Sequence, residues 1–482
     1  MSINNLSNER RTNYRWVICA MLFFATTVNY LDRQVLSLTW PLFIGPEFGW
    51  TNDDYGTITA WFSILYAVCM LFAGKFVDWM DTKKGFLWAI GIWSVGACLH
   101  AFCGIATSGI LAGEWFVTFA EAKETIGRIG DGAMVVSVSV VLFIFARFVL
   151  ALGEAGNFPA AIKATAEYFP KKDRAFSTSI FNSGATIGAM IAPACILYIA
   201  ELWGWEATFI IIGVLGFIWM GFWVFTYKKP DRNPGVNAAE LAYIRQDALT
   251  DDATATASAE KKIPFLRCFG YRQTWAFAFG KFMTDGVWWF YLFWMPKYLQ
   301  TVFHLEGTAQ VLPLTVLYTV VMVSIYGGWL PSYFIRRRGM DPYAGRMRSM
   351  LIFAFFPLLA LFAQPLGGYS YWLTVVIIGI AGAAHQAWSA NIFSTVGDMF
   401  PRTAIATVTG IGGMAGGLGS FFVQKAAGKI FDYTGRTNMR FLGFEGEPSG
   451  YFMIFIFCAA AYLIGWVVMK SLVPRYKPIS AE

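Results

Sequence analysis

Five ionisable side chains lie within or beside long apolar stretches of this chain: Asp32, Arg33, Arg147, Glu154 and Lys281. A charge at the centre of a bilayer costs at least about 2.5–3.5 kcal/mol on insertion scales. A membrane protein keeps such a group where it is paired, lines a wet cavity or does work. The basic groups could hold an anion and the acidic groups could carry a proton. We therefore expect a polar cavity inside a helical bundle.

The composition is that of a membrane protein. Of the 482 residues, 57% are hydrophobic and 14% are charged, whereas soluble proteins carry about 25% charged residues. Apolar runs of about 18 or more residues recur along the chain, and each would cross the bilayer as a helix because lipid offers no partner for open backbone groups. The sequence therefore predicts an all-α, multi-pass membrane protein.

The apolar runs predict twelve transmembrane helices in two six-helix bundles, at residues 1–227 and 271–482, joined by a cytoplasmic linker at 228–270. The linker contains a low-complexity stretch at 251–260. Asn237 as the cap, with Glu240 reaching back to it, predicts a helix start. Lys and Arg gather in both tails and in alternate loops, so both termini are predicted to be cytoplasmic. A short surface helix is expected in the outer loop at 106–132. The expected spans are 15–40, 56–77, 85–105, 133–157, 176–200, 207–227, 271–298, 310–334, 347–366, 370–396, 405–426 and 450–472. Pro159 is expected to end the fourth span.

Several classes of function are disfavoured. The net charge of +7 comes from basic residues in short loops, so nucleic-acid binding is not expected, and the seven scattered cysteines show no spacing that suggests a metal. Neither HExxH nor GxSxG is present, and the three histidines lie far apart. We expect neither an enzyme nor a cofactor, with the proton as the coupling ion.

An internal repeat supports two related halves. Glu167-Tyr-Phe-Pro170 precedes the fifth predicted span, and Asp398-Met-Phe-Pro401 precedes the eleventh, 231 residues later (398 − 167). A glycine-rich helix follows each motif. Two six-helix halves related by duplication fit a transporter that rocks around a site at the interface between the halves.

The loop after the second span resembles the signature of the major facilitator superfamily. It reads from Gly74 through Asp78 to Lys83 and Lys84, with Trp and Asp at positions 79 and 81 departing from the usual residues. The resemblance implies a conformational latch, in which Gly74 permits close packing and Asp78 with the two lysines joins helices at the cytoplasmic side. Positive-inside charge alone would explain the lysines but not the spacing of Gly74 and Asp78.

Closer resemblance lies in the first, fourth and fifth spans, in the segments Asn29–Arg33, Arg147–Pro159 and Phe181–Gly184. Together these segments resemble the anion:cation symporter family, which includes bacterial sugar-acid transporters and vesicular organic-anion carriers. The seventh span, from Lys281 to Lys297, is most similar to the hexuronate branch (galacturonate and glucuronate).

The first span would carry substrate and proton sites. Tyr30 and Arg33 are three residues apart and share a helix face, with Asn29 one turn from Arg33. A guanidinium binds a carboxylate through two parallel hydrogen bonds. The resemblance assigns Arg33 to the substrate carboxylate, Tyr30 to the pocket wall and Asp32 to proton coupling. The alternative is that Asp32 pairs with an arginine only to lock helices together.

Arg147 and Glu154 lie seven residues apart, about 10.5 Å along a helix. They are too far apart for a direct pair, so each needs another partner. The resemblance implies that Glu154 is a protonation site and that Arg147 links it to the pair in the first span. An ion pair that serves packing alone is the alternative.

In the second half, Lys281 and Asp285 are one turn apart. They could simply neutralise each other, or Lys281 could supply an extra cation for a sugar acid. Trp288 and Trp289 could stack on a sugar or belong to the core or lipid face.

Further substrate contacts are implied by the resemblance alone. His385, Trp388 and Tyr66 stand at positions that resemble substrate contacts, although His385 could be structural. Asn182 could replace a glutamine that some relatives carry where this chain has Ala185.

The sequence thus predicts a proton-coupled symporter that imports a sugar-acid monoanion, a hexuronate, by alternating access. Its expected location is the bacterial cytoplasmic (inner) membrane, as a monomer in the lipid bilayer. Alternatives of the same fold are a carrier for another organic anion (an aldonate, dicarboxylate or phosphate ester), an exchanger and a sodium-coupled carrier. A membrane-embedded enzyme and an anion channel are less favoured.

Overall fold

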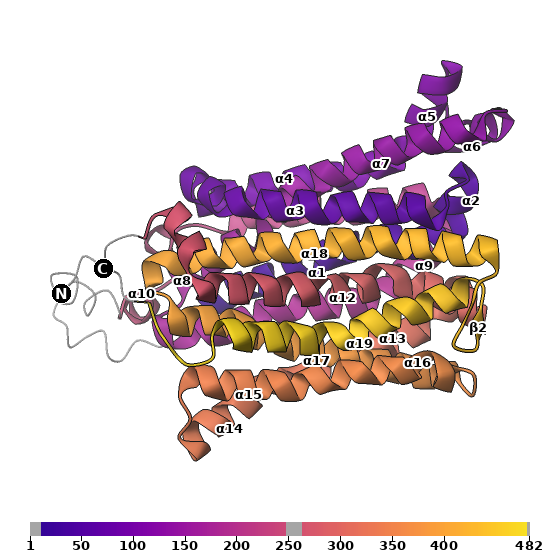
Figure 1. Cartoon of the computed structure of the whole chain (residues 1–482). Helices are drawn as coiled ribbons and strands as arrows, with labels where there is room; N and C mark the ends of the chain where they lie inside the picture. Colours follow the sequence, from indigo (N-terminus) through magenta and orange to yellow (C-terminus); the bar gives the residue numbers. More distant parts are fainter. Residues whose placement is uncertain (1–10, 247–262, 480–482) are drawn as a thin grey trace.

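The computed structural model describes residues 11–246 and 263–479, and these form long helices with one short β hairpin (Figure 1). Strands β1 (Arg440–Phe441) and β2 (Phe444–Glu445) pair antiparallel. Short 3-10 or π segments interrupt or extend several helices. The helices are α1 Tyr14–Thr39, α2 Gly45–Phe48, α3 Asn52–Met80, α4 Thr82–Ala101, α5 Cys103–Ala112, α6 Phe119–Arg128, α7 Gly132–Glu154, α8 Asn157–Tyr168, α9 Lys171–Thr226, α10 Ala238–Ile244, α12 Arg272–Phe303, α13 Val311–Val321, α14 Trp329–Arg338, α15 Pro342–Phe355, α16 Ala360–Gly367, α17 Tyr371–Met399, α18 Arg402–Thr437 and α19 Glu447–Leu472.

The long helices run side by side in one elongated bundle (Figure 1). In the first half α1 packs on α9, and α4 packs on both α7 and α9. In the second half α12 packs on α18 and α19, and α13 packs on α17. The two halves meet where α3 packs on α18 and where α9 packs on α13. Helices α4 and α7 lie on one outer side of the bundle, and α14 and α15 lie on the other (Figure 1).

Seven of the described helical stretches are long and apolar enough to cross a membrane, or eight if the bent pair α4–α5 is one span. This confirms a multi-pass helical membrane protein. The pair α4–α5 bends by 53°, and the expected surface helix in the outer loop is α6.

Two breaks divide long helices near expected span ends. In α9, Gly204 adopts φ 87° and ψ 165°, so the helix folds back there. The expectation that Pro159 ends the fourth span is wrong: the break comes at Ala155 and Gly156, and Pro159 lies in the first turn of α8. Proline is tolerated in a first turn because the amide hydrogens there lack helical partners.

The two copies of the repeat occupy equivalent places. Pro170 caps the start of α9 and Pro401 caps the start of α18, with nearly equal backbone angles (φ −64°, ψ 157° and φ −63°, ψ 152°). The acid of each copy bonds to the neighbouring helix: Glu167 accepts from Thr82 Oγ1 at 2.6 Å, and Asp398 accepts from Arg346 Nε at 2.5 Å. The two motifs therefore share a local structure, with a proline at the start of a long helix and an acid bonded to a neighbouring helix.

The described part of the linker is tied to the first half. Asn237 caps α10 by accepting from the amide of Glu240 at 2.9 Å, as expected. The Glu240 carboxylate bonds to the start of α1 through Arg15 Nη1 (2.9 Å) and Thr12 Oγ1 (2.6 Å), where we expected it to reach back to the cap. The low-complexity stretch at 251–260 lies outside the described residues.

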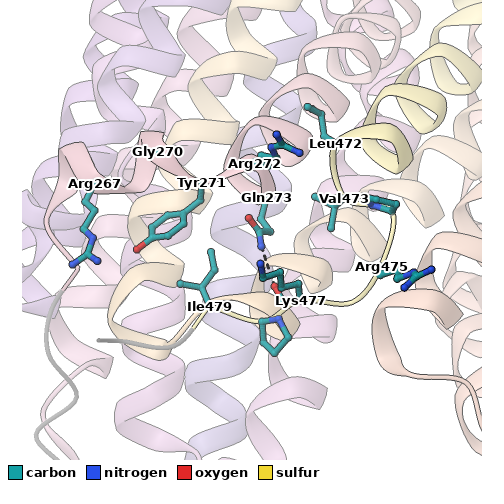
Figure 2. Close-up of a pocket in the computed structure, with 12 residues that line it drawn as sticks. Arg267, Gly270, Tyr271, Arg272, Gln273, Leu472, Val473, Arg475, Lys477 and Ile479 are labelled. Atoms are coloured by element: carbon teal, nitrogen blue, oxygen red, sulfur yellow. Dashed lines mark hydrogen bonds between the residues drawn. The ribbon is translucent and has the colours of Figure 1, made fainter.

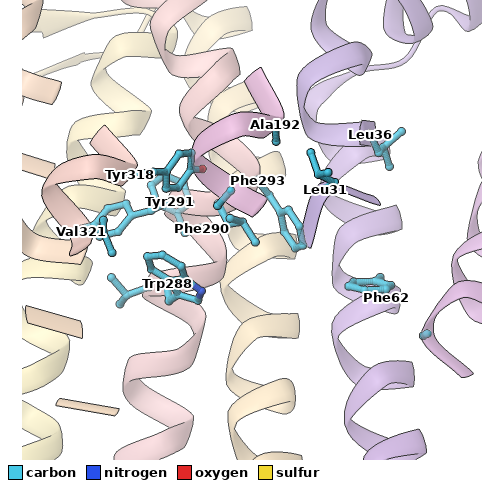
Figure 3. Close-up of a cluster of buried hydrophobic side chains, with 14 of the residues drawn as sticks. Leu31, Leu36, Phe62, Ala192, Trp288, Phe290, Tyr291, Phe293, Tyr318 and Val321 are labelled. Atoms are coloured by element: carbon cyan, nitrogen blue, oxygen red, sulfur yellow. The ribbon is translucent and has the colours of Figure 1, made fainter. Parts of the chain in front are cut away.

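Apolar side chains from both halves form one continuous core. Figure 3 shows Leu31, Phe62, Trp288, Phe290 and Tyr318 among the buried members of this cluster. The charged residues of α1, α7 and α12 therefore sit in surroundings of low polarity, where electrostatic interactions are stronger than in water.

Polar bonds join the two halves at the end of the bundle where α3 begins. Asp432 of α18 accepts from the backbone amides of Asn52 (3.0 Å) and Asp53 (2.8 Å). Lys425 donates to Asp53 at 2.6 Å, and Glu201 accepts from the amide of Thr308 at 2.8 Å. These bonds hold the two halves together at this end of the bundle.

Candidate functional site

A buried ion pair between α1 and α7 lies at the centre of the first half. Arg33 donates to Glu154 Oε2 through Nη2 at 2.6 Å and through Nε at 3.1 Å. The two side chains are 4% and 0% exposed. Glu154 needed a partner outside its own helix, and Arg33 is that partner. The second carboxylate oxygen of Glu154 has no hydrogen bond among the described residues.

Aromatic rings surround the Arg33 guanidinium. Its carbon lies 5.0 Å from the ring centre of Tyr30, 4.7 Å from that of Tyr66 and 5.1 Å from that of Trp289. Rings at these distances attract a cation through their electron-rich faces. Tyr30, Tyr66 and Trp289 are partly accessible, whereas Arg33 is buried. Trp289 belongs to α12, so the second half closes over the cation of the first.

Asp32 and Arg147 are buried beside this pair. Both carboxylate oxygens of Asp32 and one guanidinium nitrogen of Arg147, Nη1, are buried without a hydrogen-bond partner among the described residues. The Arg147 guanidinium lies 5.2 Å from the ring centre of Phe62. Asn29 is fully buried and both of its amide atoms also lack a partner in the described chain. The alternative in which Asp32 pairs with an arginine to lock helices together is therefore not seen among the described residues.

A second ion pair lies in the other half. Lys281 Nζ lies 2.7 Å from Asp285 Oδ2 one turn along α12, with the side chains 7% and 15% exposed. The ammonium also lies 4.3 Å from the ring centre of Phe393. The structure thus shows the neutralising contact between these two residues, while a lysine retains two further N–H donors.

His385 and Trp388 lie together on α17 against Tyr462 of α19. His385 Nδ1 is 2.8 Å from the Tyr462 hydroxyl, and its ring stacks on Trp288 at 5.5 Å with an interplanar angle of 2°. Trp388 is fully buried and packs edge-on against Tyr462. Trp288 is therefore a core residue that supports His385.

The remaining predicted residues lie apart from the Arg33 pair. Asn182 is exposed on α9. In the expected latch, Lys83 Nζ donates to the carbonyl of Val224 at 2.7 Å and Lys84 is exposed. Among the described residues no atom lies within 4 Å of a Cβ built at Gly74, so the close packing expected there is not seen in this structure. The side chain of Asp78 lies outside the described part of the structure.

Two kinds of positioning residue escaped the sequence analysis. Phe62 lies four residues before Tyr66, and this helical spacing could have placed it in the site. Gly153 allows α7 to lie directly on α4, because a Cβ there would be 2.2 Å from the amide nitrogen of Trp93. Gly188 plays the same part between α9 and α1, with a Cβ position 2.5 Å from the carbonyl oxygen of Thr27.

A bundle of membrane-length helices around buried, aromatic-walled charges is the arrangement of a solute transporter. The model of the Major Facilitator Superfamily matches residues 22–424, more than half of the chain. The chain belongs to this superfamily, which confirms the predicted membership. It is a multi-pass membrane transporter and not an enzyme.

Relatives within the superfamily show which of its transporters this chain resembles. The hexuronate transporter of Escherichia coli (strain K12) is 29% identical over 427 residues, which cover 87% of this chain and 88% of the relative. The probable galactarate/D-glucarate transporter GudP of Bacillus subtilis (strain 168) is 24% identical over 439 residues, covering 89% and 88%. The resemblance to bacterial hexuronate transporters is therefore confirmed.

Solved structures agree in fold. A bacterial homolog of the human lysosomal transporter Spinster superposes with a TM-score of 0.66 at 17% identity, over 96% of this chain and 97% of the other. A D-xylose-proton symporter gives 0.65 at 13% identity, over 98% and 99%. At these identities the likeness concerns the fold alone.

Proposed function

We propose that this transporter is a proton-coupled symporter that imports a sugar-acid monoanion of the hexuronate class by alternating access. The observation that carries the proposal is the Arg33–Glu154 pair, a buried guanidinium held by one carboxylate oxygen inside an aromatic cage. A substrate carboxylate and Glu154 would compete for the same donors. A proton on Glu154 would weaken the pair and release Arg33 for the substrate.

Charge balance supports coupling to a proton. Arg33, Arg147 and Lys281 supply three cations, and Asp32, Glu154 and Asp285 supply three carboxylates, all within the bundle. An anion that entered alone would leave uncompensated charge in surroundings of low polarity, where such charge is costly. A proton that enters with the anion restores the balance. The Asp32 carboxylate, which has no described partner, is a second proton acceptor in this scheme.

The second half favours a monoanion. Lys281 is bonded to Asp285 and is not a free cation for a second carboxylate. Its two remaining N–H donors suit substrate hydroxyl groups. So do His385 and the indole N–H of Trp388, which has no hydrogen-bond partner among the described residues. The name of the Escherichia coli relative points to the same class of substrate. Tyr30, Tyr66 and Trp289 would then pack on the sugar ring.

The described helices support a twelve-span topology. Seven stretches and the bent α4–α5 pair pass the length and hydropathy test. One of these stretches, Phe176–Thr226, has 51 residues, about 76 Å of helix and twice the bilayer core; it folds back at Gly204 and would form two spans. The long helices α1, α12 and α18 would add three more, each carrying the polar or glycine-rich face of the interior.

We also propose the predicted orientation and division. The halves are 1–227 and 271–482, joined by the linker at 228–270, with both termini in the cytoplasm of a bacterium and the protein, as a monomer, in the inner membrane. The closed end with Asp53, Lys425 and Asp432 would then face outward. Lys83, with Asp78 and Lys84, would act near the opposite face as helices rearrange.

Uptake into proteoliposomes tests the proposal. An imposed inward proton gradient should drive accumulation of labelled galacturonate or glucuronate, without any need for sodium. Unlabelled hexuronates should compete better than aldonates, aldarates or sugar phosphates. Accumulation that requires sodium and ignores the pH gradient would contradict the coupling, and preference for an aldarate would contradict the substrate class.

A further inference from the structure

A basic cavity of about 550 Å³ lies where α12 begins and α19 ends (Figure 2). The segment Phe265–Gly270, the first residues of α12 and the chain after α19 line it. The lining contains four basic side chains and, among the described residues, no acidic one. The basic residues are Arg267, Arg272, Arg475 and Lys477. The cavity therefore has the charge of an anion site.

The chain after α19 is fixed across the bundle. Gln273 Nε2 donates to the carbonyl of Lys477 at 2.9 Å, drawn as a dashed line in Figure 2. The amide of Ile479 donates to the carbonyl of Met399 at 2.8 Å, and Lys470 Nζ donates to the carbonyl of Pro474 at 2.7 Å. These bonds hold the basic residues of this segment beside the start of α12, so this side of the cavity is fixed by hydrogen bonds.

The surroundings of the cavity suit the membrane surface. Leu266 is 80% exposed, and Phe265 and Trp275 are about half exposed. Trp275 Nε1 donates to the carbonyl of Phe269 at 2.8 Å, which holds the segment Phe265–Gly270 against α12. Exposed aromatic and aliphatic side chains next to basic ones, at the end of a long apolar helix, are typical of the membrane–water interface.

We propose that this cavity binds the head group of an anionic phospholipid. Arginine presents parallel N–H donors that match phosphate oxygens, and Arg272 and Arg475 line the cavity from its two sides. Basic residues beside a transmembrane helix attract anionic lipid. The exposed Phe265, Leu266 and Trp275 offer contacts for acyl chains, which inorganic phosphate lacks. The site is separate from the Arg33 site, and the proposal does not depend on the transported substrate.

The test uses the full-length protein, purified in detergent and titrated with phosphatidylglycerol, phosphatidylcholine or inorganic phosphate, with melting temperature as the readout. The site variant is Arg272→Gln/Arg475→Gln/Lys477→Gln. The matched control is Arg336→Gln/Arg337→Gln/Arg338→Gln, which removes three exposed charges from α14. Phosphatidylglycerol alone should stabilise the wild type saturably. The site variant should need at least about tenfold more lipid, and the control should stay within about twofold of the wild type.

If the site variant and the control lost stabilisation by phosphatidylglycerol equally, the result would overturn the proposal in favour of an effect of general surface charge. Equal stabilisation by inorganic phosphate would overturn it in favour of a free-anion site. A photoactivatable phosphatidylglycerol on the wild type gives an independent result should the site variant fail to fold. Cross-links in peptides spanning 263–275 and 470–479 support the site, and cross-links confined to other peptides contradict it.

Discussion

The two buried ion pairs differ in how the chain brings their members together. Arg33 and Glu154 come from α1 and α7, 121 residues apart in sequence. Lys281 and Asp285 are four residues apart on α12. The first pair exists only when several helices pack correctly, whereas the second forms wherever α12 is helical. Separation of the first pair therefore accompanies movement between helices, and the second pair can persist throughout a transport cycle.

The aromatic contacts of the two pairs differ in the same way: the first pair is contacted from the other half, and the second from its own half. Trp289 from the other half contacts Arg33, so the first pair has a contact that depends on how the two halves meet. Lys281 contacts Phe393 within its own half. In the proposed function, the first pair would serve substrate capture and proton coupling, and the second would serve hydroxyl recognition.

Replacing the guanidinium should have the largest effect. Arg33→Lys keeps the charge but removes the planar fork that holds one carboxylate with two bonds. We expect the initial rate of hexuronate uptake to fall at least about 100-fold, as for loss of a buried charged contact. Lys281→Arg is the matched control and should retain uptake within about tenfold. Equal losses in the two variants would remove the distinction between the pairs.

Substituting Lys281 alone, and then Lys281 together with Asp285, tests what the second pair contributes. Lys281→Gln leaves Asp285 without its cation, so we expect a lower melting temperature and a KM raised about tenfold. Lys281→Gln/Asp285→Asn should recover the melting temperature while the KM stays high, because the substrate still lacks the ammonium donors. A double variant with normal KM would show that Lys281 only neutralises Asp285.

A substitution of Gly153, the residue before Glu154 on α7, should have a smaller effect. In Gly153→Ala the new Cβ would lie 2.2 Å from the amide nitrogen of Trp93, so α7 must move away from α4. Such overpacking costs about 1–3 kcal/mol, and we expect a lower melting temperature together with a several-fold loss of uptake. Gly413→Ala is the control, since a Cβ there meets nothing within 4 Å. Unchanged uptake in Gly153→Ala would show that the pair tolerates helix displacement.

A substitution in the pair of Glu47 and Lys123, near the predicted outer face, should have the smallest effect. Burial raises the pKa of Glu47 above its ordinary value of 4.5, although Trp205 and Lys123 (3.6 Å away) oppose the shift. The folded state binds this proton more tightly, so stability should decline as the pH rises from about 4.5 through the raised pKa. Glu47→Gln should remove that slope in melting temperature between pH 4.5 and 7. A slope unchanged in the variant would assign it to other groups.

Much of the fold could be predicted because lipid imposes simple rules. Long apolar runs become helices, and the match between the motifs of Glu167 and Asp398 correctly indicated two segments of similar local structure. The helix breaks were harder to place: Pro159 suggested an end to the fourth span, but Gly156 supplies the break before it. A proline only removes a donor, and in a first turn this loss costs nothing.

The sequence indicated which charged residues would be buried but not which of them would pair. The spacing of Arg147 and Glu154 showed that each needs an outside partner. Only the packing of α1 on its neighbours selects Arg33 for Glu154 and leaves Asp32 without a bond. The contact of Trp289 with Arg33 depends on how the two halves meet, which spacing along one helix does not encode. Gly74 matched a signature, yet among the described residues no atom lies within 4 Å of a Cβ built there.

The most direct test of proton coupling through the first pair is Glu154→Gln in proteoliposomes, assayed two ways. The amide cannot release a proton, so uphill uptake driven by a pH gradient should be lost. Counterflow exchange of labelled for unlabelled hexuronate, which needs no net proton movement, should continue. Full pH-driven accumulation by this variant would contradict the account.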